Sequence, residues 1–364
     1  EFAEREHEIR GCLVALMSAK HVLLLGPPGT GKSLLARKVC SSIVGANFFE
    51  KLLTRFTWQE ELFGPIAASQ LKNDKFLRKV EGYLPWAHIA FLDEIYKGNS
   101  AILNSLLTLA NEGVFHNDGI PVKTPLMSII GASNEIPDGE DGLEAFDDRL
   151  HIRFVVRRIS DRSAMKKMLA SSSHQNTATI TIEELIKAKK EVEALQIPQN
   201  VMNVYLDLWN GLKTKKYGVN ITDRVFKQAI DIMKAEAWLN GHSAVEEEDF
   251  EILQHVFWKD PAHKKDIYLE ILNTTNPEKS KITDIFLEVE SIANKVLKSN
   301  KQSTPAEGIE VLGKLKEKRA QVDKLIKNME LGNKNVTEVR EMLNKMNKLL
   351  QEVASNVVGI EVQF

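Results

Sequence analysis

The chain has 364 residues, of which 43% are hydrophobic and 27% are charged, and this composition is that of a globular protein. Its length exceeds a single ordinary core, so we expect two or three domains. The formal net charge of −2 gives no general electrostatic footprint for nucleic acid. No apolar run approaches the roughly 20 residues that a membrane-spanning helix needs.

Cys12 and Cys40 are the two cysteines of the chain, too few for a disulfide framework. Both fall in apolar helical patterns, where a buried free thiol is the expected state. This favours a reducing, intracellular compartment, and we expect a cytoplasmic protein. The chain begins without methionine and carries no signal-peptide pattern, which indicates a trimmed chain.

The first predicted strand, Val22–Leu25, leads into a glycine-rich turn and a helix that begins near Lys32. The turn matches the GxxxxGK[ST] phosphate-loop pattern at every fixed position. Its glycines let the backbone approach a polyphosphate, and the helix presents free N–H groups and the positive end of its dipole. We expect Lys32 to reach the terminal phosphates and Ser33 to ligate Mg²⁺. The residues expected to hold the nucleotide are Gly26, Pro27, Pro28, Gly29, Thr30, Gly31, Lys32, Ser33 and Leu34.

The strand predicted at Ile89–Leu92 ends in two acidic residues, Asp93 and Glu94. We expect Asp93 to hold Mg²⁺ through water or Ser33, and Glu94 to activate the attacking water as a general base. An acidic pair after a strand is often only a helix N-cap, but the phosphate loop upstream favours the catalytic interpretation.

The strand predicted at Met127–Ala132 is followed by Asn134. Its side chain is expected to hydrogen-bond both the γ-phosphate and the lytic water. A polar turn residue that merely caps the strand is the alternative.

The first 158 residues alternate apolar strands with helical stretches, which predicts a parallel α/β sheet with crossover helices. We therefore assign residues 1–158 to an α/β nucleotide-binding core. Two turn-rich insertions interrupt it at 63–84 and 114–122, and Asn117-Asp118-Gly119 predicts a tight turn in the second. The predicted strands are Val22–Leu25, Phe48–Leu53, Ile89–Leu92, Met127–Ala132 and Ile152–Val156.

Residues 159–262 are predicted to form an all-α lid. Pro198 is typical of a helix start, and Thr222 and Asp223 supply N-cap chemistry for a helix that continues through Trp238. A further compact helix is predicted at Asp249–Trp258.

Residues 263–364 predict a bundle of three helices, broken at Ser303-Thr304-Pro305 and at Gly332-Asn333. The alternative is that these helices pack on the preceding domain. The seams are Ile282, Ile285, Val289, Ile292 and Val296; then Val311, Leu315, Val322, Leu325 and Met329, interrupted by Lys318; and last Val336, Val339, Leu343, Met346, Leu350, Val353 and Val357.

The series GPPGTGKS, FLDE, SNE and DDRL resembles the AAA+ ATPases. Three longer stretches point to the MoxR-type branch, and within it to the RavA-like ATPases: LLTRFTWQEELFGP (Leu52–Pro65), EGYLPWAHIAFLDEIYK (Glu81–Lys97) and ILNSLLTLANEGVF (Ile102–Phe115). The stretch from Thr222 to Trp258 resembles the small helical lid of that group. The resemblance implies ATP as the nucleotide, which the phosphate loop alone does not distinguish from GTP.

Within this resemblance, Arg149 in DDRL is similar to the arginine finger that such enzymes insert into the site of a neighbouring subunit. The family usually has phenylalanine where this chain has Leu150, and Arg153, Arg157 and Arg158 compete for the role.

Arg224 resembles the nucleotide-binding lid arginine called sensor 2, although many relatives have Ser-Pro-Arg where this chain has Thr-Asp-Arg. A surface charge on the helix is the alternative. In this clade the two insertions project as hairpins around a central channel, which makes Phe76, Phe115 and His116 candidates for contacts with a client protein.

A site shared between subunits implies a ring, and the resemblance implies a hexamer. MoxR-type ATPases work with a von Willebrand A-type partner, and this chain has no Asp-x-Ser-x-Ser signature, so such a partner is expected to be a separate protein. The leading hypothesis is an ATP-driven, chaperone-like remodelling or assembly factor for protein complexes. The alternatives are a nucleic-acid-acting motor, a chelatase-type motor and a nucleotide-gated scaffold. The near-neutral charge disfavours nucleic acid as a partner, and Glu94 disfavours the scaffold.

Overall fold

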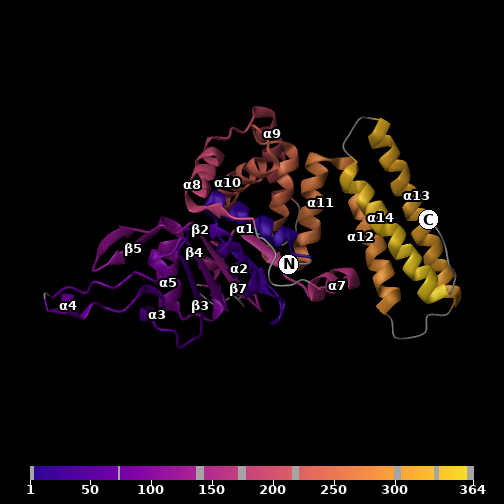
Figure 1. Cartoon of the computed structure of the whole chain (residues 1–364). Coiled ribbons are helices and arrows are strands. Elements are labelled where there is room, and N and C mark those ends of the chain that lie inside the picture. Colours follow the sequence, from indigo (N-terminus) through magenta and orange to yellow (C-terminus); the bar gives the residue numbers. More distant parts are fainter. Residues whose placement is uncertain are drawn as a thin grey trace. The chain divides into compact units, whose positions relative to one another are not determined.

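The computed structural model describes residues 4–72, 74–136, 143–170, 178–214, 221–298, 305–331 and 336–358. Two compact units make up the chain (Figure 1). The first comprises Glu1–Trp209 and Lys215–Lys264, and the second comprises Asn210–Thr214 and Lys265–Phe364. The predicted breaks at Ser303-Thr304 and Gly332-Asn333 lie outside the described residues.

Five parallel strands form the central sheet of the first unit, in the order β3-β4-β7-β1-β8. The central strands are mostly apolar because helices cover both faces of the sheet, whereas the edge strand β3 contains Glu50 and Lys51 and is partly exposed. Every residue of β1 and of β7 is buried. The five predicted strands are confirmed to within one residue at each end. Their bounds are β1 (Val22–Leu25), β3 (Phe48–Leu52), β4 (Ile89–Asp93), β7 (Ser128–Ser133) and β8 (Ile152–Val155).

The register of the sheet decides which loops meet. Leu25 of β1 pairs with Ser133 of β7 and with Val155 of β8, whereas Val22 pairs with Ile130 and Ile152. The carboxyl ends of β1, β4 and β7 therefore share one edge of the sheet. The residues that precede β8 lie at the opposite, amino-terminal edge.

The helices of the first unit flank this sheet and form the lid. The α-helices are α1 (Glu6–Ser18), α2 (Lys32–Ser41), α3 (Gln59–Phe63), α4 (Ala68–Leu71), α5 (Ser100–Glu112), α6 (Leu143–Asp147), α7 (Arg162–Ala170), α8 (Ile182–Ala194), α9 (Gln199–Thr214, whose last residues belong to the second unit) and α10 (Asp223–Asn240). The 3₁₀ helices are η1 (Leu84–Trp86), η2 (Ile95–Lys97), η3 (Glu247–His255) and η4 (Pro261–His263). A small pair of strands, β2 (Ile43–Val44) and β9 (Ile180–Thr181), lies apart from the main sheet.

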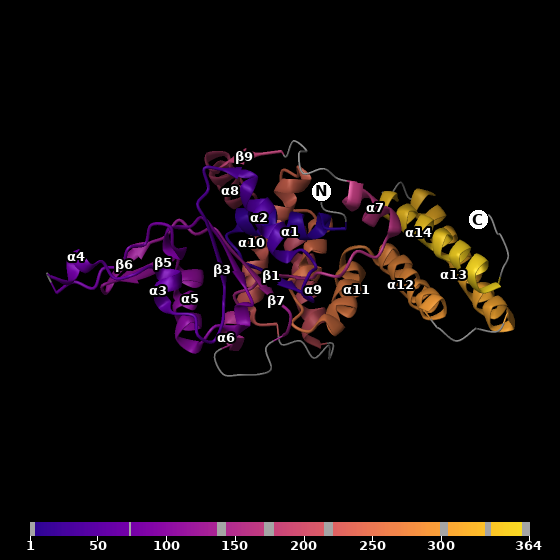
Figure 2. The ribbon, with the colours of Figure 1, turned by 60° about the horizontal axis from the view of Figure 1, so that its bottom comes forward.

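The two insertions of the core are joined to each other. The second is the antiparallel hairpin β5 (Val114–Asn117) and β6 (Ile120–Lys123), and its turn residues Asp118 and Gly119 both have positive φ, as a type I′ turn requires. The Asn117 side chain accepts from the backbone N–H of Arg78 at 2.7 Å and donates to its carbonyl at 3.2 Å. α4, β5 and β6 extend to the same side of the sheet (Figure 2).

The candidate client contacts differ in their exposure. Phe115 stacks on Phe63 with ring centroids 5.5 Å apart and is half-buried, whereas Phe76 is 58% exposed. His116 is exposed.

The lid follows the expected helical pattern, with one correction. Thr222 caps α10 as predicted, its side chain accepting from Val225 N–H at 3.4 Å. The segment predicted as a compact helix at Asp249–Trp258 is instead a 3₁₀ helix that ends at His255. The carboxylate of Asp249 is fully buried and accepts from Glu246 N–H and from Asn240, so the chain winds tightly around this residue.

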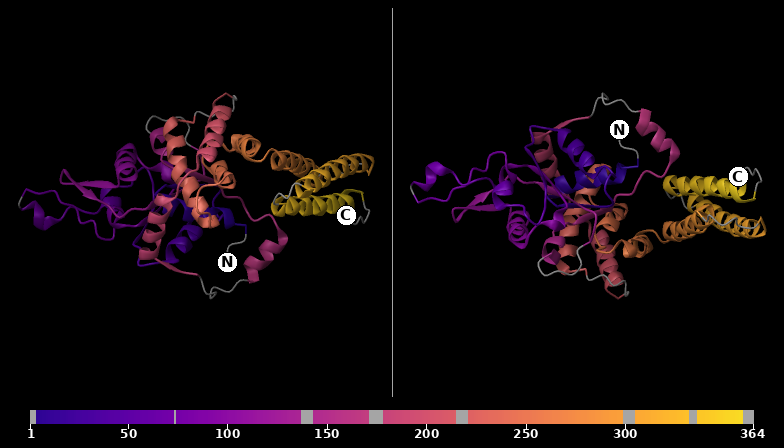
Figure 3. Two further views of the ribbon diagram at one scale, coloured as in Figure 1. Left: turned by 90° about the horizontal axis from the view of Figure 1, so that it is seen from above. Right: turned by 90° about the horizontal axis from the view of Figure 1, so that it is seen from below.

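The second unit is helical, with α11 (Lys264–Thr275, of which Lys264 belongs to the first unit), α12 (Pro277–Lys298), α13 (Pro305–Leu331), α14 (Thr337–Val353) and a terminal π-helical turn (Ala354–Val358). α12, α13 and α14 lie side by side as a three-helix bundle (Figure 3). The predicted seam of α14 faces its core, and so do Ile282, Ile285, Val289 and Ile292 of the α12 seam; at the end of α12, Leu297 packs against the core in place of the predicted Val296. In α13 the seam is corrected by one residue: Leu312 and Ile326 are buried, and the predicted Val311 and Leu325 are only partly so. Val357 lies where the side chains are not described.

Cys12 and Cys40 are buried free thiols, as predicted, and burial raises the pKa of Cys40 to about 12. Within the described ranges, no helix has the length and apolar character to cross a bilayer.

His21 makes the stability of the first unit dependent on pH. Its ring accepts from Ile129 N–H at 3.1 Å and lies 3.1 Å from the Ala110 carbonyl, which fits a neutral ring protonated on Nε2. Burial, together with the positive charge of Lys20, lowers the pKa of His21 from 6.5 to about 4. His151, 6.0 Å away between ring centroids, also has a pKa lowered by burial.

We expect the free energy of unfolding to fall as the pH drops from 6.5 to about 4, because the unfolded imidazole binds a proton there and the folded one does not. The loss attributable to His21 is about 3 kcal/mol once the pH is below 4, and it vanishes above pH 7. Thermal unfolding midpoints across this range test the prediction. In His21→Asn, the Oδ1 atom can still accept the hydrogen bond but does not titrate. We expect the unfolding midpoint of this variant to depend less on pH between 6.5 and 4. A pH dependence equal to that of wild type would contradict the role given to His21.

Candidate active site

The phosphate loop joins β1 to α2 at the carboxyl edge of the sheet, and α2 begins at Lys32 as predicted. A Cβ at Gly26 would lie 2.2 Å from the Val156 carbonyl oxygen, so only glycine lets the loop cross β8 this closely. Gly29 and Gly31 have φ of +80° and +85°, values that favour glycine. The backbone N–H groups at the start of α2 are therefore held where a phosphate can meet them.

The Lys32 ammonium is held by oxygen atoms around this loop. It donates to the carbonyls of Gly26 at 2.5 Å and Pro27 at 3.2 Å, and to the side chain of Asn134 at 3.0 Å. Burial lowers the pKa of Lys32, and the carboxylates of Asp93 and Glu94 oppose that shift. The lysine is thus pre-positioned at the mouth of the loop.

Asn134 connects Lys32 to Glu94. Its Oδ1 accepts from Lys32, and its Nδ2 donates to Glu94 Oε1 at 2.5 Å. A carboxamide can do both at once, because its oxygen accepts from the ammonium while its nitrogen donates to the carboxylate. The structure therefore brings together three of the residues predicted from the sequence, from the ends of β1, β4 and β7.

Glu94 adopts an uncommon backbone conformation. Its φ of 51° and ψ of 47° place it in the left-handed region, which costs a non-glycine residue about 1–2 kcal/mol. The turn is fixed by the Glu94 N–H, which donates to Asp93 Oδ1 at 3.0 Å, and by Ile95, which packs on Gly131 of β7. Lys97 pairs with the Glu94 carboxylate at 3.1 Å. The strained turn aims Glu94 toward Asn134 and the loop.

Asp93 and Ser33 offer a donor set that suits Mg²⁺. One carboxylate and one hydroxyl leave most coordination positions for phosphate oxygens and water, which is the arrangement Mg²⁺ prefers. No cluster of three or more His, Cys, Asp or Glu side chains that could hold a metal occurs among the described residues. The donor set of Asp93 and Ser33 fits an ion that arrives with the nucleotide.

Arg149 and Arg224 do not lie at the phosphate loop but at the opposite, amino-terminal edge of the sheet. Arg149 precedes β8, and Ile152 N–H donates to the His21 carbonyl at the amino-terminal edge of the sheet. Arg224 is at the start of α10, and both arginines donate to Asn111 at the end of α5. The strands between the two edges rise about 3.3 Å per residue, so neither arginine reaches the phosphate loop of its own chain.

Arg153 is excluded as an exposed finger, because it is 4% exposed and pairs with Asp147 at 2.7 Å. Tyr96, two residues after Glu94, donates to the same Asp147 carboxylate at 2.5 Å. The sequence analysis did not predict this buried group of Tyr96, Asp147 and Arg153, because no local pattern links a residue of η2 to one of α6. Arg157 and Arg158 are exposed beyond the carboxyl end of β8, on the same side as the phosphate loop.

The sequence analysis also did not predict the role of Arg5 beside the phosphate loop. It is 7% exposed and donates to the Arg157 carbonyl at 2.5 Å and to the Thr30 carbonyl at 3.4 Å, so it ties the phosphate loop to the end of β8. An arginine ahead of the first helix carries no motif that could have signalled this contact.

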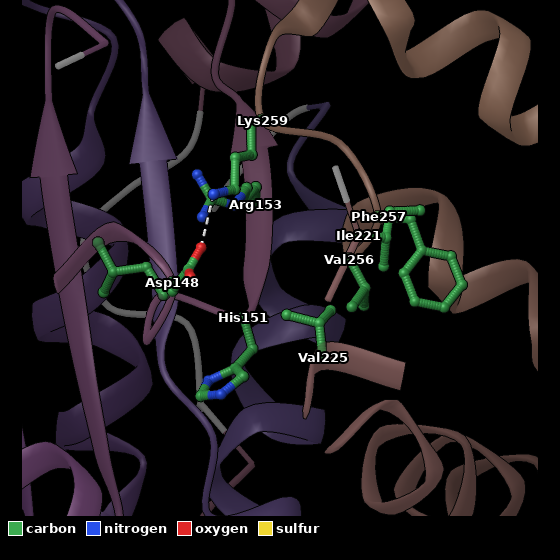
Figure 4. A pocket seen from close by; sticks show the side chains of 9 residues that line it. Asp148, His151, Arg153, Ile221, Val225, Val256, Phe257 and Lys259 are labelled. Atoms are coloured by element: carbon green, nitrogen blue, oxygen red, sulfur yellow. Dashed lines mark ion pairs between the residues drawn. The ribbon is translucent and has the colours of Figure 1, made fainter. Parts of the chain in front are cut away.

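A small pocket lies behind the Arg149 loop, between β8 and the lid (Figure 4). Its volume of about 20 Å³ has room for one water molecule and is too small for a nucleotide. Lys259 and Asp148 face each other across it at 2.6 Å.

Comparison with known proteins identifies the family. A family profile described as the MoxR domain in the MoxR-vWA-beta-propeller ternary systems matches residues 1–197. A profile described as an AAA lid domain matches residues 200–271. The chain belongs to the MoxR family of AAA+ ATPases.

Similar proteins include two archaeal relatives and one solved structure. Two uncharacterized proteins of Methanocaldococcus jannaschii are 38% and 40% identical to the chain. The first alignment covers 99% of this chain and 94% of the relative, and the second covers 81% and 77%. The crystal structure of an inferred ATPase from Cytophaga hutchinsonii matches with a TM-score of 0.59 over 76% of this chain and 91% of that one. At 17% identity, that match shows a shared fold alone.

Proposed function

We propose that the chain is an ATP phosphohydrolase that works as a ring of its own copies and remodels protein complexes. The observation that carries the enzymatic part is the hydrogen-bonded series Lys32–Asn134–Glu94 beside the phosphate loop. It gathers a cation for the terminal phosphates, an amide that can hold the lytic water and a carboxylate that can accept its proton.

Each residue of this series has a distinct role in hydrolysis. Lys32 binds the terminal phosphates, and Glu94 takes the proton of the attacking water. Asn134 keeps the Glu94 carboxylate and the water in line with the γ-phosphate. Ser33 and Asp93 would hold Mg²⁺, which would offset the negative charge that develops on the phosphate oxygens.

The positions of Arg149 and Arg224 support a site shared between copies. Both arginines lie at the sheet edge opposite the phosphate loop, so they suit the terminal phosphate of a nucleotide held by a neighbour. A head-to-tail contact of this kind repeats around a closed ring, and we propose a hexamer.

The proposal of ATP hydrolysis is tested with purified protein and Mg²⁺–ATP. We expect turnover that Lys32→Ala lowers by at least about 10²-fold, because a cation preorganised for the developing phosphate charge is lost. Lys227→Ala, an exposed lysine of α10, serves as the matched control and is expected to match wild type. Turnover that is absent, or insensitive to Lys32→Ala, would refute the proposed activity.

For the partner, we propose a separate von Willebrand A-domain protein, because the matched profile describes MoxR domains in systems with such proteins. The two buried free thiols favour the cytoplasm as the place of action. The test is co-purification with ATP-loaded Glu94→Gln, which should retain a protein carrying an Asp-x-Ser-x-Ser site. Salt-sensitive stimulation of turnover by DNA, with no such protein retained, would favour a nucleic-acid motor instead.

A further inference from the structure

Asn111 holds two arginines that come from different parts of the first unit. It lies in the last turn of α5, and its Oδ1 accepts from Arg149 Nε and from Arg224 Nη2, the latter at 2.8 Å. Arg149 belongs to the core, ahead of β8, and Arg224 belongs to the lid helix α10. Because Asn111 is exposed, this contact is not needed to satisfy a buried polar group.

The acceptor shared by the two guanidiniums is neutral. Neither Arg149 nor Arg224 forms an ion pair with a carboxylate in the part of the chain that the structure describes, and Asp148, the nearest acid along the chain, pairs with Lys259. Burial lowers the pKa of Arg149 and the positive charge of Arg224 lowers it further, whereas the carboxylate of Asp148 opposes that shift. Among the described residues, two guanidiniums are thus held side by side by a neutral acceptor and without a carboxylate paired to either, an arrangement that suits an anion with several oxygens.

The pair depends on how the lid helix docks on the core. One turn beyond Arg224, Gln228 lies 2.9 Å from His151 Nε2, and Asp231 pairs with Lys20 at 2.8 Å. These positions are four and three residues apart, so they lie on one face of α10. Arg224 therefore meets Arg149 when α10 rests on this edge of the core.

We propose that Asn111 is a positioning residue that gathers Arg149 and Arg224 into one two-arginine site for the terminal phosphate of a nucleotide held by a neighbouring copy of this chain. This inference rests on the proposed function. It adds that the anion site is built jointly by the core and the lid, and that it requires a neutral side chain at position 111.

Asn111→Asp tests this requirement, because the change keeps the shape of the side chain and adds a negative charge. If Asn111 only supports the structure, the carboxylate strengthens both contacts, and kcat stays near wild type. If the arginines must remain free of an ion pair with a carboxylate, kcat falls at least tenfold. This loss is small beside the ~10³- to 10⁵-fold increase in kcat that an arginine finger provides. We expect the fall in kcat, with an unchanged KM and an unfolding midpoint at or above that of wild type.

Two further variants separate charge from shape. Asn111→Gln keeps a neutral carboxamide and is expected to retain more turnover than Asn111→Asp. Asn347→Asp is the matched control, since Asn347 likewise accepts from an arginine, Arg319 at 2.9 Å, but in the C-terminal bundle. It is expected to hydrolyse ATP as wild type does.

The outcomes distinguish this inference from the proposed function. If wild type hydrolyses ATP in a Lys32-dependent manner and Asn111→Asp keeps kcat within twofold, the two-arginine site is wrong and the ATPase stands. If Asn111→Gln falls as far as Asn111→Asp, the charge argument is wrong. If wild type shows no Lys32-dependent turnover, the proposed function itself fails.

Discussion

Glu94→Gln is expected to bind ATP as wild type does and to lower kcat by about 10²- to 10⁴-fold, the range that a general base contributes. Glutamine keeps the size of the side chain and its oxygen can still accept from Asn134 Nδ2, so the turn at η2 should persist. What is lost is the carboxylate that takes the proton of the attacking water. Equilibrium binding of ATP and steady-state turnover, measured on the same preparation, separate the two effects.

Glu135→Gln is the matched control for this change. Glu135 is exposed, lies one residue after Asn134 and is expected to tolerate the substitution without loss of turnover. Turnover of Glu94→Gln near the wild-type value would overturn the general-base assignment. A joint loss of binding and turnover would instead mean that Glu94 supports the loop through Asn134 and Lys32.

The phosphate loop, Asp93, Glu94 and Asn134 could be predicted from the sequence because local chemistry dictates them. Gly26 belongs to a GxxxxGK[ST] pattern that is complete within eight residues, and each acidic or amide residue stands at or just after the end of a strand whose apolar run is readable on its own. Parallel strands then bring these ends to one edge without further information. The five strand positions follow from the same runs.

What escaped prediction consists of contacts between residues far apart in the sequence. Asn111 lies 38 positions from Arg149 and 113 from Arg224, and no periodicity marks it as their shared acceptor. Tyr96 and Asp147 are 51 positions apart. The one-residue error in the seam of α13 has a related cause, because either of two adjacent apolar residues satisfies the heptad, and only packing against α12 and α14 chooses between them.

The resemblance to a lid arginine also left open which nucleotide Arg224 would meet. Its contact with Asn111, at the edge where Arg149 lies, favours the nucleotide of a neighbouring copy. The same contact makes Arg149 and Arg224 members of one group, so a change in either is expected to affect the other.

Arg149→Ala is expected to keep nucleotide binding and to lower kcat by about 10³- to 10⁵-fold, because a guanidinium on the transferring phosphate stabilises charge that develops in the transition state. The binding site on the same chain is untouched, since Arg149 lies at the opposite edge of the sheet. Arg158→Ala is the matched control, as Arg158 is exposed and was a competing candidate for the finger. Loss of turnover in Arg158→Ala together with activity in Arg149→Ala would move the finger to Arg158.

Mixing Arg149→Ala with Lys32→Ala tests whether the arginine acts across subunits. The first variant keeps an intact phosphate loop and the second an intact Arg149, so a site is complete only where the two meet in the right order. In a ring assembled at random from equal amounts, that order occurs at about one interface in four. We expect turnover to recover toward a quarter of the wild-type value per subunit, while either variant alone stays inactive. Because recovery requires two chains, a mixture no more active than its components would place Arg149 outside the shared site.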